Sequence, residues 1–117
     1  MLYNNFQYKF RIVELSVEAF VEERVEDMSM NGEELITNTE KLLSKDGSFC
    51  EGKIKANLRM RVVSKEYYIR NLMMMREKTK NVLEDAHKER AWDSEFISRC
   101  KECESQASKL LSMVVSL

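Results

Sequence analysis

The chain has 117 residues, of which 44% are hydrophobic and 33% charged, and its formal net charge is −1. A disordered chain would be less apolar than this and a membrane-spanning chain less charged, so the composition excludes both classes. Proline is absent and glycine occurs only three times, which excludes a fold with many tight turns. We therefore expect a single all-α domain over residues 1–117, built from a few long helices.

The first predicted helix covers residues 5–45, where apolar or small residues recur every three or four positions. Lys41 and Lys45 suit the last turn, because cations stabilise the negative end of the helix dipole. Gly47, which follows Asp46, suits the left-handed position that ends many helices. The residues of this apolar seam are Phe6, Phe10, Val13, Val17, Val21, Val25, Met28, Gly32, Leu35, Thr39 and Leu42.

The second predicted helix covers residues 49–88. Ser48 and Glu51 have the spacing of a capping box, which predicts the start of a helix. Three consecutive methionines, residues 73–75, widen the apolar face. Because three consecutive helix residues point in three directions, we expect at least one of them to lie outside the core. The predicted seam is Ile54, Leu58, Val62, Lys65, Ile69, Leu72, Arg76, Thr79, Leu83 and Ala86.

The third predicted helix covers residues 93–116, with Asp93 as its N-cap. Its predicted seam is Phe96, Cys100, Cys103, Ala107, Leu110, Val114 and Leu117. A continuous helix from about residue 52 to the end of the sequence is the alternative, because no glycine marks a break near residue 90. With three helices and short links, we expect an elongated up-down-up bundle of antiparallel, coiled-coil-like helices.

The chain contains three cysteines, and Cys100 and Cys103 form a C-x-x-C pair. A zinc site needs about four ligands, and His87 is the only histidine. We therefore expect both thiols on a buried helix stripe in a reducing compartment. The sequence contains no glycine-rich phosphate-binding loop, no G-x-S-x-G motif of serine hydrolases and no H-E-x-x-H motif of zinc-dependent hydrolases. We expect a protein that is not an enzyme, with no catalytic residue, cofactor or metal.

The charge is distributed unevenly along the chain. Residues 1–45 carry nine acids and five bases, a net of −4, and residues 53–88 carry four acids and ten bases, a net of +6. A basic middle segment favours an acidic protein partner. Nucleic acid is disfavoured, because nucleic-acid modules are usually basic overall and this chain has a pI of about 5.9. We expect no membrane contact and a cytoplasmic location, since no signal or spanning segment occurs.

Several short segments, in the same order along the chain, resemble the tubulin-folding cofactor A family (tubulin-specific chaperone A). These segments are Glu40-Lys41-Leu42 with Asp46-Gly47, Lys53-Ile54-Lys55-Ala56, Arg70-Asn71-Leu72 and Val82-Leu83-Glu84. The resemblance covers about residues 10–110 and implies a three-helix cytoplasmic chaperone that captures β-tubulin during folding and heterodimer assembly. The family bends its second helix at a proline, and this chain has residues 64–67, Ser-Lys-Glu-Tyr, at that place.

For this function we expect the partner to contact the basic middle helix. The residues expected to make the contact are Tyr67, Arg70, Asn71, Met74 and Glu77. The partner is expected to be β-tubulin or another protein, not a small molecule, and a monomer is favoured over a dimer. The alternative is a self-associating coiled-coil adaptor or structural subunit of a larger assembly, which would follow if the second and third helices were one.

Overall fold

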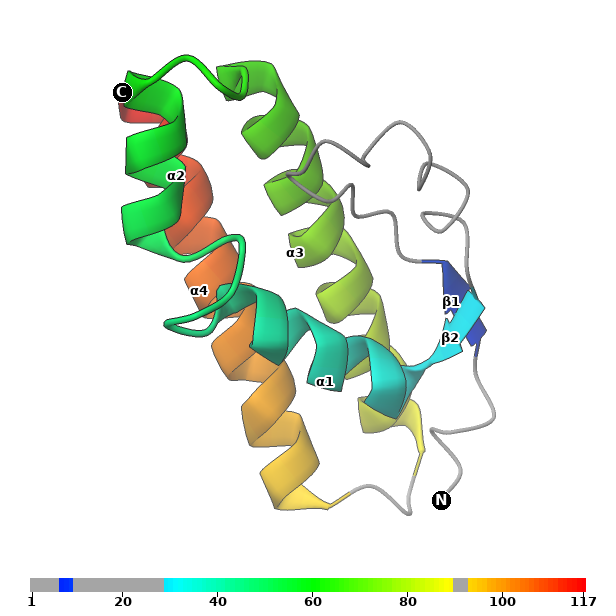
Figure 1. Ribbon diagram of the computed structural model, residues 1–117. Helices are drawn as coiled ribbons and strands as arrows, with labels where there is room; N and C mark the ends of the chain where they lie inside the picture. The colour runs from blue at the N-terminus through cyan, green and yellow to red at the C-terminus, as the bar shows by residue number, and fades with distance from the viewer. Residues whose placement is uncertain (1–6, 10–28, 90–92) are drawn as a thin grey trace.

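The computed structural model describes residues 7–9, 29–89 and 93–117, and the statements that follow concern these residues. In chain order they form β1 (Gln7–Lys9), β2 (Ser29–Asn31), α1 (Gly32–Leu43), α2 (Glu51–Arg59), α3 (Lys65–Lys88) and α4 (Ser94–Ser116), as labelled in Figure 1. The prediction of a helical protein is confirmed for most of the described chain. The three-helix arrangement is not what these residues form.

The two longest helices, α3 and α4, form an antiparallel hairpin (Figure 1). Each buries residues that recur at intervals of three or four, as expected for helices with one apolar stripe. The stripe of α3 consists of Tyr68, Asn71, Leu72, Met75, Thr79, Val82 and Ala86. The stripe of α4 consists of Phe96, Ile97, Cys100, Cys103, Ala107, Leu111 and Val114. The predicted burial of both thiols is therefore confirmed.

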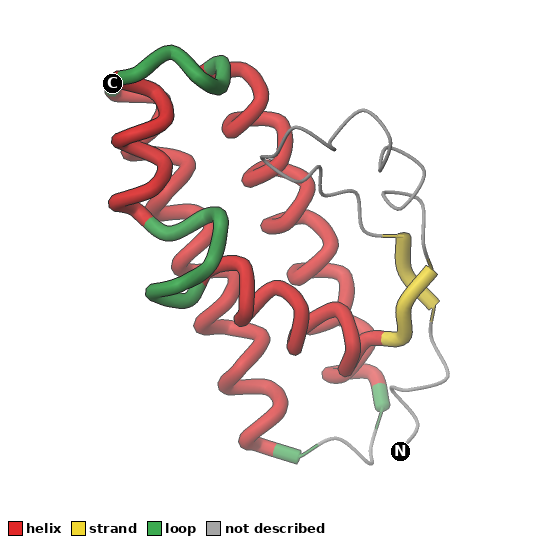
Figure 2. Tube along the Cα trace, in the orientation of Figure 1, coloured by secondary structure: helices red, strands yellow, loops and turns green. Residues whose placement is uncertain are grey.

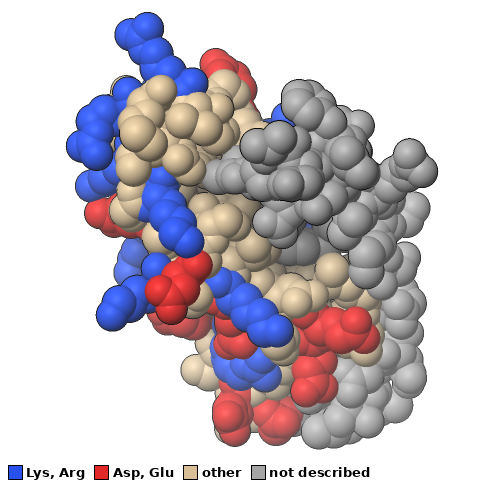
Figure 3. All heavy atoms as spheres, in the orientation of Figure 1, with Lys and Arg blue, Asp and Glu red and all other residues tan. Residues whose placement is uncertain are grey.

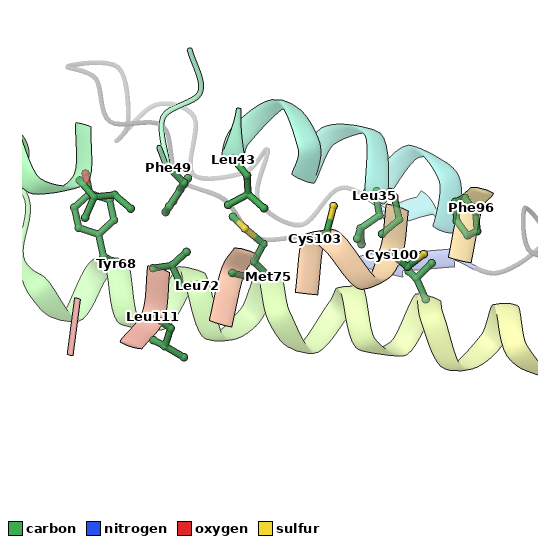
Figure 4. Close-up of a cluster of buried hydrophobic side chains, with 14 of the residues drawn as sticks. Leu35, Leu43, Phe49, Tyr68, Leu72, Met75, Phe96, Cys100, Cys103 and Leu111 are labelled. Carbon is green, nitrogen blue, oxygen red and sulfur yellow. The ribbon is translucent and has the colours of Figure 1, made fainter. Parts of the chain in front are cut away.

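Helix α1 crosses this hairpin and closes the core. Asn31 caps it, since its Oδ1 accepts a hydrogen bond from the Glu34 backbone N–H at 2.9 Å. Leu35 and Leu43 point from α1 toward side chains of α3 and α4, as Figure 4 shows. The described part of the molecule thus has one hydrophobic core, shared by α1, α2, α3 and α4.

The predicted first helix over 5–45 is wrong over residues 7–9 and 29–31, whereas its C-terminal end is close to the predicted place, because α1 ends at Leu43. Residues 7–9 and 29–31 are strands, which pair antiparallel with Tyr8 opposite Met30, and the helix begins only at Gly32. The Tyr8 hydroxyl donates a hydrogen bond to the Asp85 carboxylate on α3. In these two segments, backbone pairing and this distant contact therefore replace the predicted helical structure. The predicted seam residues from Phe10 to Met28 lie outside the described residues.

The predicted second helix over 49–88 is divided into α2 and α3. Arg61 has a φ of 58°, a left-handed conformation that an α-helix cannot contain. Ser64 then caps α3, with its Oγ accepting a hydrogen bond from the Tyr67 backbone N–H at 3.1 Å. The predicted seam residue Val62 is consequently exposed. The break ends at Ser64, the first residue of the stretch 64–67 that stands where the resembling family has its proline.

The predicted capping box at Ser48 is also wrong, because Cys50 is the N-cap of α2 and makes no side-chain capping bond. Gly47 does not have a positive φ. It is required for another reason: a Cβ at this position would lie 2.2 Å from the carbonyl oxygens of both Lys41 and Leu42. The tight link brings Phe49 into the core, where its ring meets the Tyr68 ring edge-on at 5.7 Å.

The predicted break near residue 90 is confirmed. Helix α3 ends at Lys88, and α4 begins at Ser94 after Asp93, whose Oδ1 accepts a hydrogen bond from the Phe96 backbone N–H at 2.7 Å. The alternative of one continuous helix from about residue 52 is therefore wrong. The methionine prediction is confirmed as well, because Met75 is buried whereas Met73 is 48% exposed.

Candidate interaction surface

The five residues predicted to contact a partner all lie in α3, and they differ in burial. Arg70 and Glu77 are exposed, and Met74 and Tyr67 are partly buried. Tyr67 stacks on the Phe49 ring with centroids 6.4 Å apart. Whether these four contact a partner stays a prediction.

Asn71 differs from the other four because it belongs to the core. Its side chain is 3% exposed, and its Nδ2 donates a hydrogen bond to the Tyr67 carbonyl one turn earlier at 2.8 Å. A buried amide needs such a bond to offset the loss of water. In the folded chain Asn71 therefore supports the packing of α3, and it offers a partner no surface.

Exposed apolar side chains gather at another place, the end of the molecule formed by the α2–α3 link and the last turn of α4. Met60, Val62, Val115 and Leu117 are 62%, 66%, 56% and 58% exposed. The tip of α4 lies beside the end of α2 in Figure 1, which brings residues far apart in the sequence together. Among the described residues, Met73 is the one other large apolar side chain with comparable exposure.

A groove of about 910 Å³ lies at this end. Its lining combines three apolar residues, four basic residues, one acid and one serine. These are Leu58, Val63 and Leu117; Lys55, Arg59, Arg61 and Lys65; Glu66; and Ser64. We call this surface the basic groove. Figure 3 shows Lys and Arg side chains surrounding other residues at this end of the molecule.

The basic groove exists because the chain breaks between α2 and α3. On a continuous helix, Lys55 and Arg59 would share a face, but Lys65 would lie ten residues, or about 15 Å, further along the axis than Lys55. The left-handed turn at Arg61 reverses the chain and brings the end of α2 close to the first turn of α3. Sequence reasoning missed this surface, because no glycine or proline marks the turn. The one available signal was Ser64, a favourable N-cap residue.

The bases of the basic groove are available to a partner. The Lys55 ammonium pairs with the Glu51 carboxylate at 3.0 Å, and both side chains are at least half exposed. Such a surface pair contributes little to stability and exchanges readily with another anion. Arg59 and Arg61 are exposed. The groove therefore presents positive charge beside apolar surface.

The two buried thiols of α4 have a different character. Burial raises the pKa of Cys100 and of Cys103 to about 12, so both remain protonated near neutral pH. A thiol is a good nucleophile or metal ligand only as the thiolate. Among the described residues, no group of three or more His, Cys, Asp or Glu side chains has an arrangement that could hold a metal ion. These thiols act in packing.

Comparison of the chain with protein-family models, with curated proteins and with solved structures finds no match. Within the described ranges, none of the helices combines the length and apolar character needed to cross a membrane. The comparisons add neither an activity nor a partner. Among the surfaces of the described residues, the basic groove combines positive charge with exposed apolar side chains.

Proposed function

We propose that this chain is a non-catalytic binding protein that holds an acidic protein partner in the basic groove. The observation that supports the proposal is the coincidence of four bases with three apolar side chains in one groove. Apolar contacts supply most of the affinity at a protein interface, whereas charge complementarity supplies orientation and association rate. The groove provides both.

The charge of the basic groove is local. The whole chain has a net charge of −1, whereas the groove lining carries four bases and one acid, a net of +3. A local positive field attracts an acidic surface without making the protein a general polyanion binder. Binding should therefore weaken as ionic strength rises, because salt screens exposed charges beyond a Debye length of about 8 Å at physiological ionic strength.

The resemblance to tubulin-folding cofactor A makes β-tubulin the first acidic partner to test. In that narrower proposal the chain is a chaperone that captures β-tubulin during folding and heterodimer assembly. The chaperone and cytoskeletal roles rest on the resemblance alone. The described residues do not form three long rods, so the contact proposed here is the basic groove, with the exposed residues Arg70 and Glu77 of α3 as a second area of contact.

The test uses biolayer interferometry to measure the affinity of the full chain for purified β-tubulin and for an unrelated acidic protein. The groove variant is Arg59→Glu with Arg61→Glu. The control variant, Lys80→Glu with Lys101→Glu, makes the same charge change at exposed positions outside the groove. We expect about tenfold weaker binding for the groove variant, or about 1.4 kcal/mol, and little change for the control.

Two results decide between the broad and narrow proposals. If no acidic protein binds at micromolar concentration, or if both variants lose affinity equally, the groove is not the binding surface and the proposal is wrong. If acidic proteins bind in a groove-dependent manner but β-tubulin binds no better than the others, capture of an acidic partner stands and the tubulin role is wrong.

A self-associating adaptor or structural subunit is the second candidate function. It is favoured by the exposed apolar residues Met60, Val62, Val115 and Leu117, since apolar patches often mark interfaces. In a twofold-symmetric dimer through this end, however, the bases of one groove would face those of the other, and like charges repel. We therefore expect a monomer in sedimentation equilibrium at low salt. A stable dimer or larger species would favour the adaptor instead.

A further inference from the structure

We infer that the segment bound by the basic groove is an acidic amphipathic helix, with aliphatic side chains on one face and carboxylates beside them. This inference rests on the proposed function, because it specifies the partner of the same groove. It identifies the partner by the chemistry of the groove lining: an apolar floor, a basic rim and no strand edge with which an extended peptide could pair.

The apolar part of the groove comes from three separate places in the chain. Leu58 lies in α2, Val63 in the link that precedes α3, and Leu117 immediately after α4. Leu58 and Val63 are partly buried against the core, whereas Leu117 is exposed. A recessed apolar floor with an exposed flank favours insertion of aliphatic side chains from one face of a partner.

The basic rim has a helical repeat along α2. Lys55 and Arg59 are four residues apart, so they are stacked one turn apart on the same face, about 6 Å along the axis. Carboxylates at positions i and i+4 of a partner helix have the same repeat. A partner helix lying along α2 therefore brings one carboxylate to each base, while its apolar face meets the floor. Arg61 and Lys65 extend the positive rim beyond the end of α2.

An extended segment fits the groove less well, because its backbone groups would have no partners. A peptide strand needs the free edge of a sheet for its N–H and C=O groups. The strands of the described chain, β1 and β2, lie beside the opposite end of α3 from the α2–α3 link, as Figure 2 shows. A helix satisfies its own backbone hydrogen bonds and needs from the groove only side-chain contacts.

A lipid surface is the other chemistry that combines apolar and anionic groups. The exposed residues Met60 and Val62 would suit insertion into a bilayer. A flat bilayer, however, leaves a recessed floor such as Leu58 and Val63 uncovered, whereas a helix fills it. The protein partner is therefore favoured, and the lipid surface becomes an outcome of the test.

The test uses the full chain and three labelled peptides of equal length and equal negative charge. The first has leucine at a helical repeat with glutamate at i and i+4. The second has the same composition in a scrambled order without an apolar face, and the third has glutamine in place of leucine. Fluorescence anisotropy gives the affinities, and circular dichroism reports helix formation. Vesicles of neutral lipid, with and without anionic lipid, form a separate arm.

We expect the amphipathic peptide to bind about tenfold or more tightly than the other two and to gain helix on binding, since only it meets floor and rim together. Leu117→Asp should remove this preference. Met73→Asp is the matched control, because Met73 is similarly exposed but lies on α3 outside the groove. Unchanged circular dichroism and thermal unfolding verify that each variant is folded.

The remaining outcomes separate the inference from the proposed function. Equal affinity for all three peptides, sensitive to salt, overturns the helix inference and leaves capture of an acidic partner standing. Groove-dependent binding to anionic vesicles without binding to the amphipathic peptide overturns it in favour of lipid. If neither peptides nor acidic proteins bind, both proposals are wrong. The inference is also wrong if Leu117→Asp keeps the preference for the amphipathic peptide and Met73→Asp removes it. That result would place the binding site on α3.

Discussion

Arg99 of α4 binds Glu40 of α1 through two hydrogen bonds, with Nε 3.0 Å from Oε2 and Nη2 2.7 Å from Oε1. The same Nη2 lies 3.2 Å from the Thr37 hydroxyl oxygen, to which it donates. Hydrogen bonding to the Glu40 carboxylate raises the pKa of the Arg99 guanidinium, so this group keeps its positive charge in alkaline solution as well. This two-point contact holds α1 across the α3–α4 hairpin in one orientation.

Glu40→Gln should lower the free energy of unfolding by about 1 kcal/mol, because an amide cannot accept both bonds of the guanidinium. The value is modest because the two side chains are 32% and 39% exposed, and water replaces part of the loss. Urea unfolding of the unchanged protein and of Glu40→Gln measures this difference in the free energy of unfolding. The matched control, Lys55→Gln, breaks an exposed ion pair and should change stability by less than about 0.5 kcal/mol. Equal effects would contradict a special role for the Arg99 contact.

Thr79→Val should leave stability unchanged or raise it by about 1 kcal/mol. Thr79 is buried, and its Oγ1 has no hydrogen-bond partner in the described part of the chain, so a methyl group of similar size removes an unpaired polar atom. Thr39→Val is the matched comparison, because buried Thr39 donates a hydrogen bond to the Leu35 carbonyl at 2.7 Å. It should cost about 1 kcal/mol. Thermal or urea unfolding measures both, and a loss at Thr79 as large as that at Thr39 would sink the prediction.

Gly47→Ala should be among the most destabilising single changes, with a loss of several kcal/mol, about 3 or more. The new Cβ would lie 2.2 Å from two backbone carbonyl oxygens, so the link between α1 and α2 must rearrange. Gly52→Ala is the control within α2, where no atom beyond the two chain neighbours and the backbone of the helix itself lies within 4 Å of the new Cβ. It should stabilise by about 0.5–1 kcal/mol, since alanine favours the helix. In urea unfolding, we expect Gly47→Ala to lower the midpoint concentration and Gly52→Ala to raise it.

Alkaline pH should destabilise the protein from about pH 9 upward. The ordinary pKa of a cysteine thiol is 9.0, whereas burial raises the pKa of Cys100 and Cys103 to about 12 in the folded chain. Between these values the unfolded chain has lost protons that the folded chain retains, so rising pH favours unfolding. The stability linked to the thiols is therefore complete below pH 9 and is lost toward pH 12.

Urea unfolding at a series of pH values from 7 to 11 measures this loss. Replacing both thiols, Cys100→Ala with Cys103→Ala, should make the decline above pH 9 shallower. Part of the decline should remain, because burial also raises the pKa of Tyr68. The double variant should be less stable at pH 7 by about 1–3 kcal/mol, owing to the cavities left in the core. An unchanged alkaline slope would show that the thiols are not the titrating groups.

The elements that sequence reasoning predicted best are those whose ends are specified locally. The α3–α4 boundary was found because Asp93 is an N-cap residue followed by an apolar repeat, and the structure confirms its capping bond to Phe96. Burial of Cys100 and Cys103 followed from the same repeat. The details of that repeat were less accurate: Leu111 is buried where Leu110 had been expected, and Leu117 is exposed.

The first helix and the α2–α3 break were mispredicted because their causes are distant or conformational. The hydrogen bond between Tyr8 and Asp85 joins residues 77 positions apart, and no local window of sequence contains both. The turn at Arg61 uses a positive φ that most residues avoid, so composition gave no warning of it. The partner-contact residue Asn71 was misjudged for a similar reason, because its burial depends on how α3 packs.

The amino-acid sequence by itself determined the helical character of most described residues, the break between α3 and α4 and the buried stripe of α4, because these follow from spacing and capping over a few residues. Only the tertiary structure decided where the chain reverses, which side chains remain exposed and how Lys55, Arg59 and Lys65 meet beside Leu58 and Leu117. A surface assembled from three separate segments depends on packing between them, and packing is a property of the whole fold.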